Sequence, residues 1–362
     1  MKLARLALVG IALVSTLVVS TGCTKKTDQS STSMTSAAKV SKEVHLGIWS
    51  NYVTPEMLAA FEKASGIKVI VSNYSSNEEL LAKMQAGGAG FDVVVPSDYM
   101  VTSMIQLKLL KKLDPAKIPN AKSLEPRFLK KAYDPTNEFS LPFDWGTTGI
   151  AVNRQLYKGQ VKGWKDLFES PELAGKIAFL DDAREVIGAA LKFQGHSLNT
   201  KNAKDLEEAK KLLISTRKRV KLYSSESLLT LTNGEAAVTQ AYVSDSMQAR
   251  SKMNGQVDYI LPAEGGTWWI DNLVIPASAE HADEAHQLIN FLLEPKIVAM
   301  TVKTVFVSPT SQAAMSLLPP EILNNHAMFP SERDLSKFEM LQDLGDSMRE
   351  WDKIWTELKA TE

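Results

Sequence analysis

The chain has 362 residues, of which 44% are hydrophobic and 23% are charged, and its formal net charge is -1. This composition is normal for a globular protein, and the roughly 320 residues from Val44 onward are enough for two domains of ordinary size. The near-neutral charge, with no basic block, makes nucleic acid an unexpected partner.

The N-terminus has the pattern of an export signal. Lys2 and Arg5 precede an apolar run over residues 6–19, and small residues follow up to Cys23. We therefore expect a signal peptide at residues 1–22. Cys23 is the only cysteine, so no disulfide can form within the chain. Its position resembles the lipidation site of bacterial lipoproteins; a simple signal peptide with a stray cysteine and an uncleaved anchor are the alternatives.

The segment after Cys23 has the composition of a linker. Residues 24–42 are rich in Ser, Thr and Lys and contain few large apolar side chains. Such a segment cannot bury enough surface to offset the entropy lost on ordering. We therefore interpret residues 23–43 as a lipidated N-terminus followed by a flexible linker, with the lipid as the only contact with the membrane.

Beyond residue 43, strands and helices are predicted to alternate. Thr54 and Pro55 begin one helix, which ends at Gly66, and Asn77 is the predicted cap of the next. The strands are predicted at residues 44–49, 67–71 and 91–95. Strand–helix alternation at this spacing predicts a parallel sheet.

The same alternation returns in the second half of the chain. The predicted strands are residues 176–180, 237–242, 257–261 and 269–275. Helices are predicted at residues 182–193, 244–253, 282–293 and 335–358. We expect an α/β protein with two lobes, each a mostly parallel sheet flanked by helices, and a ligand cleft where the strand ends meet.

Several classes of site are not expected. The sequence has no P-loop, zinc-protease helix motif or nucleophile elbow. The glycine-rich residues 87–90 precede a strand, so they are interpreted as a turn and not as a phosphate-binding loop. His281 and His286 are five residues apart on a polar helix and are interpreted as solvated side chains. We therefore expect no catalytic residue, no metal and no cofactor.

Aromatic and polar residues gather at the predicted strand ends. In open α/β sheets the carboxyl ends of the strands face the ligand crevice, so these side chains are candidates for one site. The candidates are the aromatic residues Trp49, Tyr52, Tyr99, Tyr242 and Trp269 and the polar residues Ser97, Asp182, Glu185, Asp245 and Asp271.

This set matches the chemistry of a polyamine, which is a methylene chain with two or more ammonium groups. Aromatic faces suit the methylenes and attract a cation by about 0.5–2 kcal/mol per contact. Each desolvated ammonium group needs a carboxylate, because a buried unpaired charge is costly. Taken singly, the residues also have structural explanations. Asp182 and Glu185 form a capping-box pattern, Tyr242 fits an ordinary core, and Asp245 could cap the following helix.

From Val44 to Lys359 the sequence resembles the periplasmic spermidine/putrescine-binding proteins of polyamine ABC transporters. The most specific matches are residues 49–52, 66–70, 92–97, 181–186 and 288–293. The resemblance implies a type II periplasmic-binding-protein fold, whose two lobes close on a ligand.

The resemblance also implies roles for individual residues. The ligand-binding positions that it implies are Trp49, Ser50, Tyr52, Ser97, Tyr99, Asp182, Glu185, Tyr242, Asp245, Trp269 and Asp271. Trp49 and Trp269 would stack on the methylenes. Asp182 and Glu185 would hold one ammonium group, and Asp271 would hold another.

Three positions depart from the family pattern. Asn51 replaces an acid that the putrescine branch uses, Val307 falls where a tyrosine is usual, and Leu341 falls where the spermidine branch has glutamine. Tyr242 stands where tryptophan is usual, whereas Asp245 matches an acid typical of the putrescine branch. These changes leave the choice between putrescine and spermidine open.

We expect a monomeric binding protein of the periplasm or of the outer face of the cell membrane, which delivers a polyamine to the permease subunits of an ABC importer. Lobe 1 is expected to comprise residues 44–147 and 270–315, and lobe 2 residues 148–269 and 316–362. The alternatives are the same fold with a different amine or an amino-acid-like ligand, or a sensor that reports the ligand. An extracytoplasmic enzyme is disfavoured, because no nucleophile, metal or cofactor motif accompanies the acids.

Overall fold

The structure, a computed structural model, describes residues 42–87 and 90–360. The predicted signal peptide, Cys23 and nearly all of the predicted linker lie outside the described residues. The first element is strand β1 (Lys42–Trp49), which begins two residues before the predicted start of the folded chain at Val44.

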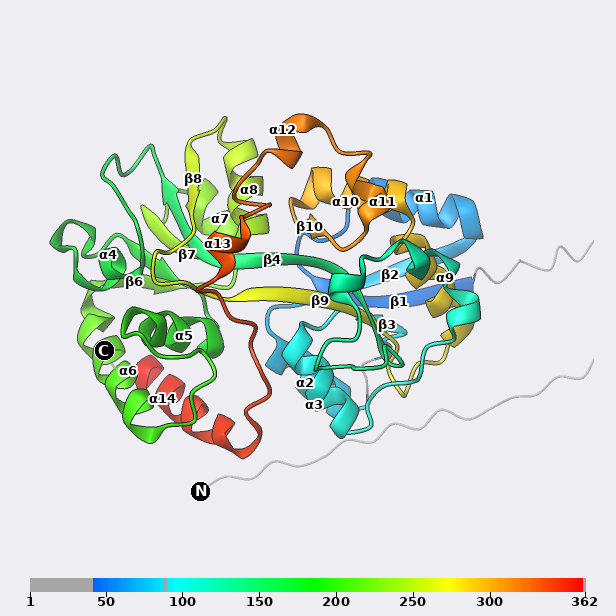
Figure 1. The fold of residues 1–362 in the computed structure, drawn as a ribbon, viewed down its shortest axis with the longest axis horizontal. Coiled ribbons are helices and arrows are strands. Elements are labelled where there is room, and N and C mark those ends of the chain that lie inside the picture. Colours follow the sequence, from blue (N-terminus) through cyan, green and yellow to red (C-terminus); the bar gives the residue numbers. More distant parts are fainter. Residues whose placement is uncertain (1–41, 88–89, 361–362) are drawn as a thin grey trace, which may run out of the picture. The chain divides into compact units, whose positions relative to one another are not determined.

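The N-terminal elements form the predicted parallel sheet (Figure 1). Strand β1 pairs in parallel with β2 (Ile67–Tyr74) on one side and with β3 (Val93–Val94) on the other. Helix α1 (Pro55–Ser65) connects β1 to β2, with Thr54 as its side-chain cap and Gly66 ending it at a φ of 71°. Gly66 adopts this left-handed conformation without strain because it has no Cβ.

Helix α2 (Asn77–Gln85) follows β2, but Asn77 is not its cap. The cap is Ser76, whose Oγ accepts a hydrogen bond from Glu79 N at 3.1 Å. The side-chain oxygen of Asn77 instead accepts a hydrogen bond from Ser97 N at 3.0 Å. The sequence offers two adjacent residues that can cap a helix, and a contact distant in sequence occupies one of them.

Two strands in the middle of the sheet connect its two parts. Strand β4 (Ser140–Asn153) is buried along its whole length, and its first half pairs antiparallel with β9 (Trp268–Val274). From Thr148 onward β4 pairs antiparallel with β7 (Val238–Tyr242) and β8 (Val257–Ile260) instead. With β5 (Ile177–Phe179) and β6 (Val220–Tyr223), the strand order is β2-β1-β3-β9-β4-β7-β5-β6. The sequence did not predict β4 or these antiparallel pairings, since Pro142 and Gly146 interrupt the strand pattern.

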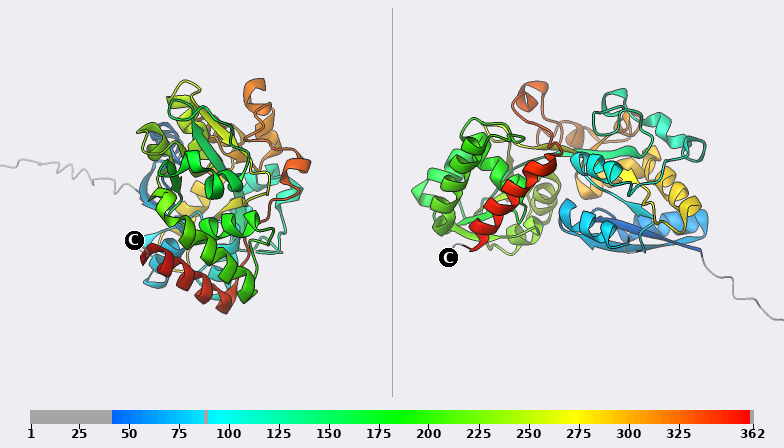
Figure 2. Two further views of the ribbon diagram at one scale, coloured as in Figure 1. Left: turned by 90° about the vertical axis from the view of Figure 1, so that its left-hand side faces the viewer. Right: turned by 90° about the horizontal axis from the view of Figure 1, so that it is seen from below.

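The remaining strands form a second parallel set. Strand β5 (Ile177–Phe179) pairs in parallel with β6 (Val220–Tyr223) and with β7 (Val238–Tyr242), while β8 (Val257–Ile260) pairs with β4. Figure 2 shows the C-terminal helix α14 (Met348–Ala360) beside the helices of this part, where it contacts α5 and α6.

The other helices connect or cover these strands. Their bounds are α3 (Asp98–Gln106), α4 (Trp164–Glu169), α5 (Ala183–Phe193), α6 (Ala203–Thr216), α7 (Ser227–Thr232), α8 (Val243–Lys252), α9 (Ala282–Leu292), α10 (Pro295–Val305), α11 (Gln312–Met315), α12 (Pro320–Leu323) and α13 (Glu332–Leu335). A short strand, β10 (Ser308–Pro309), pairs antiparallel with β4.

The predicted helix over residues 335–358 is wrong in its first half. Helix α14 occupies only the second half, and the segment before it runs beside the start of β9. Glu339 N donates to Gly266 O at 3.0 Å, and Trp268 N donates to Glu339 O at 3.1 Å. These hydrogen bonds to a distant strand outweigh the local helical preference of the segment, which is a weak determinant by comparison.

The two histidines singled out in the sequence have structural partners. His286 is buried, so its predicted solvated state is wrong: its Nε2 accepts a hydrogen bond from Asp114 N at 2.9 Å. His281 Nδ1 lies 3.0 Å from Asp92 Oδ2. Within residues 42–87 and 90–360, no group of three or more His, Cys, Asp or Glu side chains is arranged to hold a metal ion. No helix in the same part of the chain is long and apolar enough to span a membrane.

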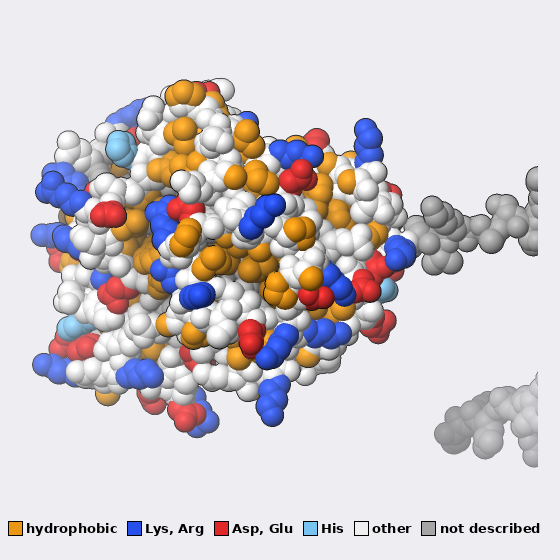
Figure 3. Space-filling model, turned by 45° about the vertical axis from the view of Figure 1, so that its right-hand side comes forward, with side chains coloured by type: hydrophobic (Ala, Val, Ile, Leu, Met, Phe, Trp, Pro, Cys, Tyr) orange, Lys and Arg blue, Asp and Glu red, His pale blue; other side chains and the backbone are white. Residues whose placement is uncertain are grey.

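Charged side chains are mixed over the surface. On the face drawn in Figure 3, basic and acidic side chains are interspersed. Among the described residues, oppositely charged side chains also pair, such as Lys83 with Glu79 at 2.7 Å and Lys117 with Asp283 at 2.6 Å. Exposed pairs of this kind contribute little to stability, and the mixed signs on the face drawn in Figure 3 give that face no extended field of one sign.

Candidate ligand-binding site

A pocket lies at the carboxyl ends of β1, β2, β5, β6 and β7 and beside the start of β9. It encloses about 790 Å³ of space between the atoms, part of which is open to solvent. All eleven residues predicted to bind the ligand line this pocket. The other lining residues are Asn51, Tyr74, Ser75, Asn77, Asp98, Ser225, Glu226, Ser244, Thr267 and Leu341. The sequence-based placement of the candidate residues at one cleft therefore agrees with the geometry.

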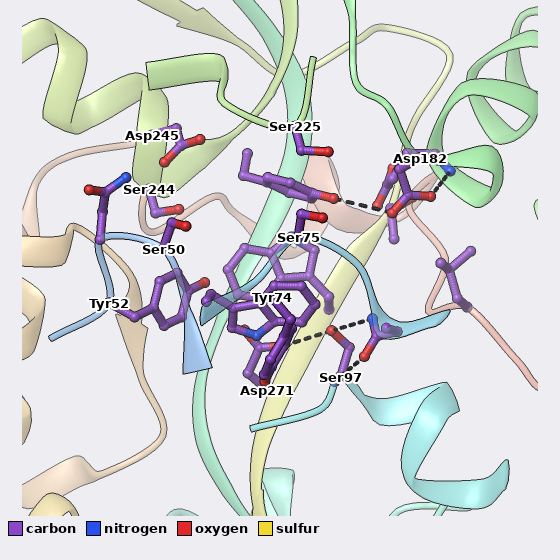
Figure 4. A pocket seen from close by; sticks show the side chains of 18 of the residues that line it. Ser50, Tyr52, Tyr74, Ser75, Ser97, Asp182, Ser225, Ser244, Asp245 and Asp271 are labelled. Atoms are coloured by element: carbon purple, nitrogen blue, oxygen red, sulfur yellow. Dashed lines mark hydrogen bonds between the residues drawn. The ribbon is translucent and has the colours of Figure 1, made fainter. Parts of the chain in front are cut away.

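Asp271 lies at one end of the pocket and is almost fully buried, with 3% of its surface exposed. Its Oδ1 accepts a hydrogen bond from Ser97 Oγ at 2.7 Å, and Tyr52 also hydrogen-bonds to its carboxyl group. Figure 4 shows Ser97 and Asp271 pointing toward one another. Burial raises the pKa of Asp271 to about 7, and the hydrogen bonds from Ser97 and Tyr52 limit the rise.

Ser97 is held in place from the first part of the sheet. Asn77 contacts it twice: Asn77 Oδ1 accepts from Ser97 N at 3.0 Å, and Asn77 Nδ2 donates to Ser97 Oγ at 3.2 Å. Tyr74 anchors the neighbouring wall, since its hydroxyl donates to Val95 O at 2.6 Å. The helix and strand ends of this part thus fix the side chains that face Asp271.

Glu185 forms a second acidic centre and is only 5% exposed. Its two carboxyl oxygens accept hydrogen bonds from Thr148 Oγ1 at 3.0 Å and from Thr267 Oγ1 at 2.9 Å. Burial and the nearby Asp182 raise the pKa of Glu185 to about 8. Thr148 lies where β4 changes its partner from β9 to β7, and Thr267 immediately precedes β9. Both strands that connect the two parts of the sheet therefore position this carboxyl group.

Asp182 caps helix α5 and also faces the pocket. Its Oδ1 accepts a hydrogen bond from Glu185 N at 3.1 Å, and its Oδ2 accepts one from the Tyr242 hydroxyl at 3.4 Å. Burial raises the pKa of Asp182, and its hydrogen bonds oppose the rise. The capping-box interpretation is half right, because the carboxyl group of Glu185 turns to the threonines rather than to the backbone of Asp182.

Asp245 has no capping role. Helix α8 has no side-chain cap, and Asp245 Oδ2 instead accepts a hydrogen bond from Ser227 Oγ at 2.6 Å. Burial raises the pKa of Asp245 to about 6. Asp245 therefore adds a further carboxyl group to the pocket, at the end of β7.

Aromatic rings line the pocket between the acidic centres. Trp49 packs edge-on against Tyr74 with ring centroids 4.6 Å apart, and Trp269 packs edge-on against Tyr242 at 6.3 Å. The indole nitrogens of both tryptophans are buried and have no hydrogen-bond partner among the described residues. Gly146 makes room for Trp269, because a Cβ at this position would come within 2.5 Å of the indole ring.

Tyr99 completes the wall on the side of α3. Its hydroxyl donates to Glu78 Oε1 at 2.9 Å, and the buried Arg184 guanidinium lies over its ring at 5.4 Å. Arg184 does not line the pocket, so its positive charge is kept behind the ring. These two contacts hold the ring of Tyr99 in place, and Arg184 stays outside the lining of the pocket.

The pocket has an unbalanced charge. Six of the described lining residues are acidic, namely Asp98, Asp182, Glu185, Glu226, Asp245 and Asp271, and none is Lys, Arg or His. Burial disfavours the ionised form of a carboxyl group and raises the pKa values of Asp98, Asp182, Glu185, Asp245 and Asp271. The charge of Arg184, which lies outside the lining, partly opposes the rise at the first three of these. An arrangement of this kind is suited to a ligand that brings its own positive charge.

Some lining residues escaped the sequence analysis. Tyr74 ends β2 and could have been found by the strand-end argument, whereas Ser225 and Glu226 follow β6, which was not predicted. Of the three departures from the family pattern, Asn51 and Leu341 line the pocket, while Val307 is fully buried and does not.

Known proteins share the sequence pattern and the fold of this chain. The family model of bacterial extracellular solute-binding proteins matches residues 56–330. The chain is 36% identical to spermidine/putrescine-binding periplasmic protein 1 of Haemophilus influenzae, over 94% of this chain and 95% of that protein. It is 33% identical to the putrescine-binding periplasmic protein PotF of Escherichia coli, over 88% of this chain and 92% of that protein.

Solved structures with the same fold cover most of the chain. A spermidine/putrescine ABC transporter substrate-binding protein, PotD of Streptococcus pneumoniae, superposes with a TM-score of 0.74 at 30% identity, covering 88% of this chain and 99% of that chain. The Tp0655 (TpPotD) lipoprotein of Treponema pallidum superposes with a TM-score of 0.76 at 28% identity, over 88% and 99%. The fold is the two-lobed α/β architecture of type II periplasmic binding proteins. The chain belongs to the family of bacterial extracellular solute-binding proteins, as a homologue of the spermidine/putrescine-binding periplasmic proteins.

Proposed function

We propose that this protein is the substrate-binding component of an ABC importer and that its ligand is a polyamine, putrescine or spermidine. The observation that carries the proposal is the charge of the pocket, which has six acidic side chains and no basic one among its described lining residues. A ligand with two or more ammonium groups supplies the missing counter-charge. The names of the relatives, which refer to spermidine and putrescine, support the same ligand class.

The aromatic rings and the acids would divide the ligand between them. Trp49 and Trp269 would cover the methylene chain. Asp182 and Glu185 would hold one ammonium group, and Asp271 would hold another. Bound ammonium groups stabilise the ionised form of nearby carboxyl groups, so the ligand would lower the pKa values that burial raises in the free protein.

We further propose how the molecule is organised in the cell. The lobes would comprise residues 44–147 with 270–315 and residues 148–269 with 316–362, and the ligand would lie between them. The protein would be a monomer without catalytic activity that presents its ligand to permease subunits. Cys23 would carry a lipid that anchors it in the periplasm or on the outer face of the cell membrane; the relative from Treponema pallidum is itself described as a lipoprotein.

Calorimetric titration of the purified protein tests the ligand class. We expect putrescine and spermidine to bind with one molecule per chain. Butylamine has the four-carbon chain of putrescine but one ammonium group, so it leaves one acidic centre unpaired. Removing one member of a desolvated charge pair typically costs about 3–5 kcal/mol, and butylamine should therefore bind weaker by two orders of magnitude or more.

The same titration contains its own counter-test. The matched ligand 4-aminobutyrate replaces one ammonium group by a carboxylate, which the acidic pocket should reject. Native mass spectrometry of the protein as purified should detect any amine that remains bound. Tight binding of 4-aminobutyrate without binding of either polyamine would overturn the proposal.

A further inference from the structure

Asp144 is a buried acid that the proposed binding roles leave unexplained. It lies in the first half of β4, and only 2% of its surface is exposed. Neither of its carboxyl oxygens has a hydrogen-bond partner among the described residues. Buried polar groups are nearly always paired, and an unpaired carboxylate is among the most costly groups to bury. Because an unpaired buried carboxyl group destabilises the fold, we interpret Asp144 as a functional residue and not as a structural one.

The register of the sheet directs Asp144 toward the pocket. In the antiparallel pair of β4 and β9, Asp144 stands opposite Asp271 and Gly146 stands opposite Trp269. Residues directly opposite in such a pair project from the same face, with Cβ atoms about 4.5–5.5 Å apart. Asp271 and Trp269 both line the pocket, so the register places Asp144 on the same face of the sheet, directly beside Asp271. Asp144 is not itself a lining residue, so it lies behind the pocket wall that Asp271 forms. The irregularity in this register lies before Asp144 and leaves the pairing intact.

The surroundings of Asp144 offer it no positive charge. The titratable groups that interact with Asp144 or Asp271 are Asp98 and the hydroxyl groups of Tyr52, Tyr74 and Tyr133, and none of them carries a positive charge. Burial and the charge of Asp271 raise the pKa of Asp144 well above its usual range. Like charges directly opposite on a sheet are destabilising, so the two carboxyl groups share at least one proton when no cation is present.

We propose that Asp144 and Asp271 together form a two-carboxyl subsite for a primary ammonium group of the ligand. Asp144 loses its proton to the solvent as the ammonium group enters, and the ligand keeps all of its own protons. The carboxylate so formed adds a second negative charge and accepts one of the three hydrogen bonds that a primary ammonium group can donate. This inference rests on the proposed binding of a polyamine and adds a residue to that site.

Two substitutions of similar volume test the role of Asp144. Asp144→Asn keeps the shape and removes the ionisable group, and Asp144→Leu is an apolar replacement that a buried site accepts without an unpaired polar atom. Both should weaken putrescine binding by about tenfold or more, since a change of one pKa unit on binding corresponds to a tenfold change in affinity. In the Asp144→Asn background, Asp271→Asn should cost less affinity than in the wild type, because the two residues act as a pair.

Proton release distinguishes a ligand-binding Asp144 from a structural one. Titrations with putrescine at one pH, in two buffers of different ionisation enthalpy, give the number of protons released per ligand bound. The Asp144→Asn protein should release fewer protons than the wild type. Equal affinity and an equal proton count in the two proteins would overturn the inference.

A remote acid serves as the control. Asp92 is as buried as Asp144, but its oxygens accept hydrogen bonds from His45 N and His281 N. Neither acid lines the pocket, but only Asp144 stands opposite a lining residue, Asp271, in the sheet. Asp92→Asn should lower stability and leave both putrescine affinity and proton release unchanged. If the wild-type protein binds no polyamine, the proposed function is wrong. If it binds a polyamine and the Asp144 substitutions change neither affinity nor proton release, only this inference is wrong.

Discussion

Buried carboxyl groups determine how the free protein responds to pH. Burial is the first cause of the raised pKa values of Asp98 and Glu185, both about 8, and of Asp271, about 7. In an unfolded chain the same groups titrate near pH 4. Between these limits the folded protein therefore binds more protons than the unfolded chain does, and its stability decreases as pH rises.

We predict that the melting temperature of the ligand-free protein falls between about pH 5 and pH 8. Saturating putrescine should raise the melting temperature more at the upper end of this interval, because ammonium groups favour the ionised carboxylates that destabilise the free protein. Calorimetric scans with and without putrescine measure both effects. A free protein that gains stability over this interval, or a ligand effect that does not change with pH, would contradict the prediction.

The candidate residues were predictable where a simple rule applied. Residues such as Trp49 and Tyr242 end strands whose patterns are clear, and the carboxyl ends of parallel strands meet at one crevice. Asp144 could not be found in this way, because it lies inside a strand that the sequence did not reveal. Its importance depends on its register against β9, which is set by contacts between residues far apart in the chain.

At the level of secondary structure, the start of helix α5 combines two roles in one residue. Asp182 Oδ1 caps the helix, while Oδ2 faces the pocket beside Tyr242. Asparagine caps helices as well as aspartate does, so Asp182→Asn keeps the cap and removes the charge. We predict stability within about 0.5 kcal/mol of the wild type. Putrescine affinity should fall roughly 10- to 100-fold, since a hydrogen bond to a charged group contributes about 1.5–3 kcal/mol.

A second helix cap supplies the control for this measurement. Asn202 caps α6, where its side chain accepts a hydrogen bond from Lys204 N at 2.9 Å, and it does not line the pocket. Asn202→Ala should lower the free energy of unfolding by about 1 kcal/mol without changing affinity. If Asp182→Asn changes neither stability nor affinity, Asp182 acts only as a cap.

Elements with strong local signals were predicted best. Helix α1 has both its cap and its terminating glycine in the sequence, and the structure places it where the pattern does. The segment before α14 has a helical composition but hydrogen-bonds to Gly266 and Trp268 instead. Propensity describes a segment in isolation, so it cannot anticipate a partner strand that arrives from elsewhere in the chain.

For the molecule as a whole, the sequence predicts attachment to a membrane through Cys23. We expect Cys23→Ser to release the protein from the membrane fraction or to stall its processing. Ser20→Leu is the matched control, because leucine is usual at this position before a lipidated cysteine, and it should leave attachment unchanged. Cell fractionation and the mass of the mature protein provide the measurement. If the Cys23→Ser protein fractionates as the wild type does and its mature mass shows no loss of a lipid, Cys23 is not lipidated.

The change of partners along β4 has a consequence for the order of folding. One edge of β3 pairs with β1, and its other edge pairs only with β9, through Val94 and Val274. The second half of β4, in contrast, pairs with β7 and β8, which come before β9 in the chain. Contacts between distant residues require larger loops to close and form more slowly. During synthesis the edge of β3 therefore stays open until β9 has been made. Trp269 and Asp271 lie on that same strand, so the step that closes the sheet also brings the last two of the eleven predicted ligand-binding residues into the pocket.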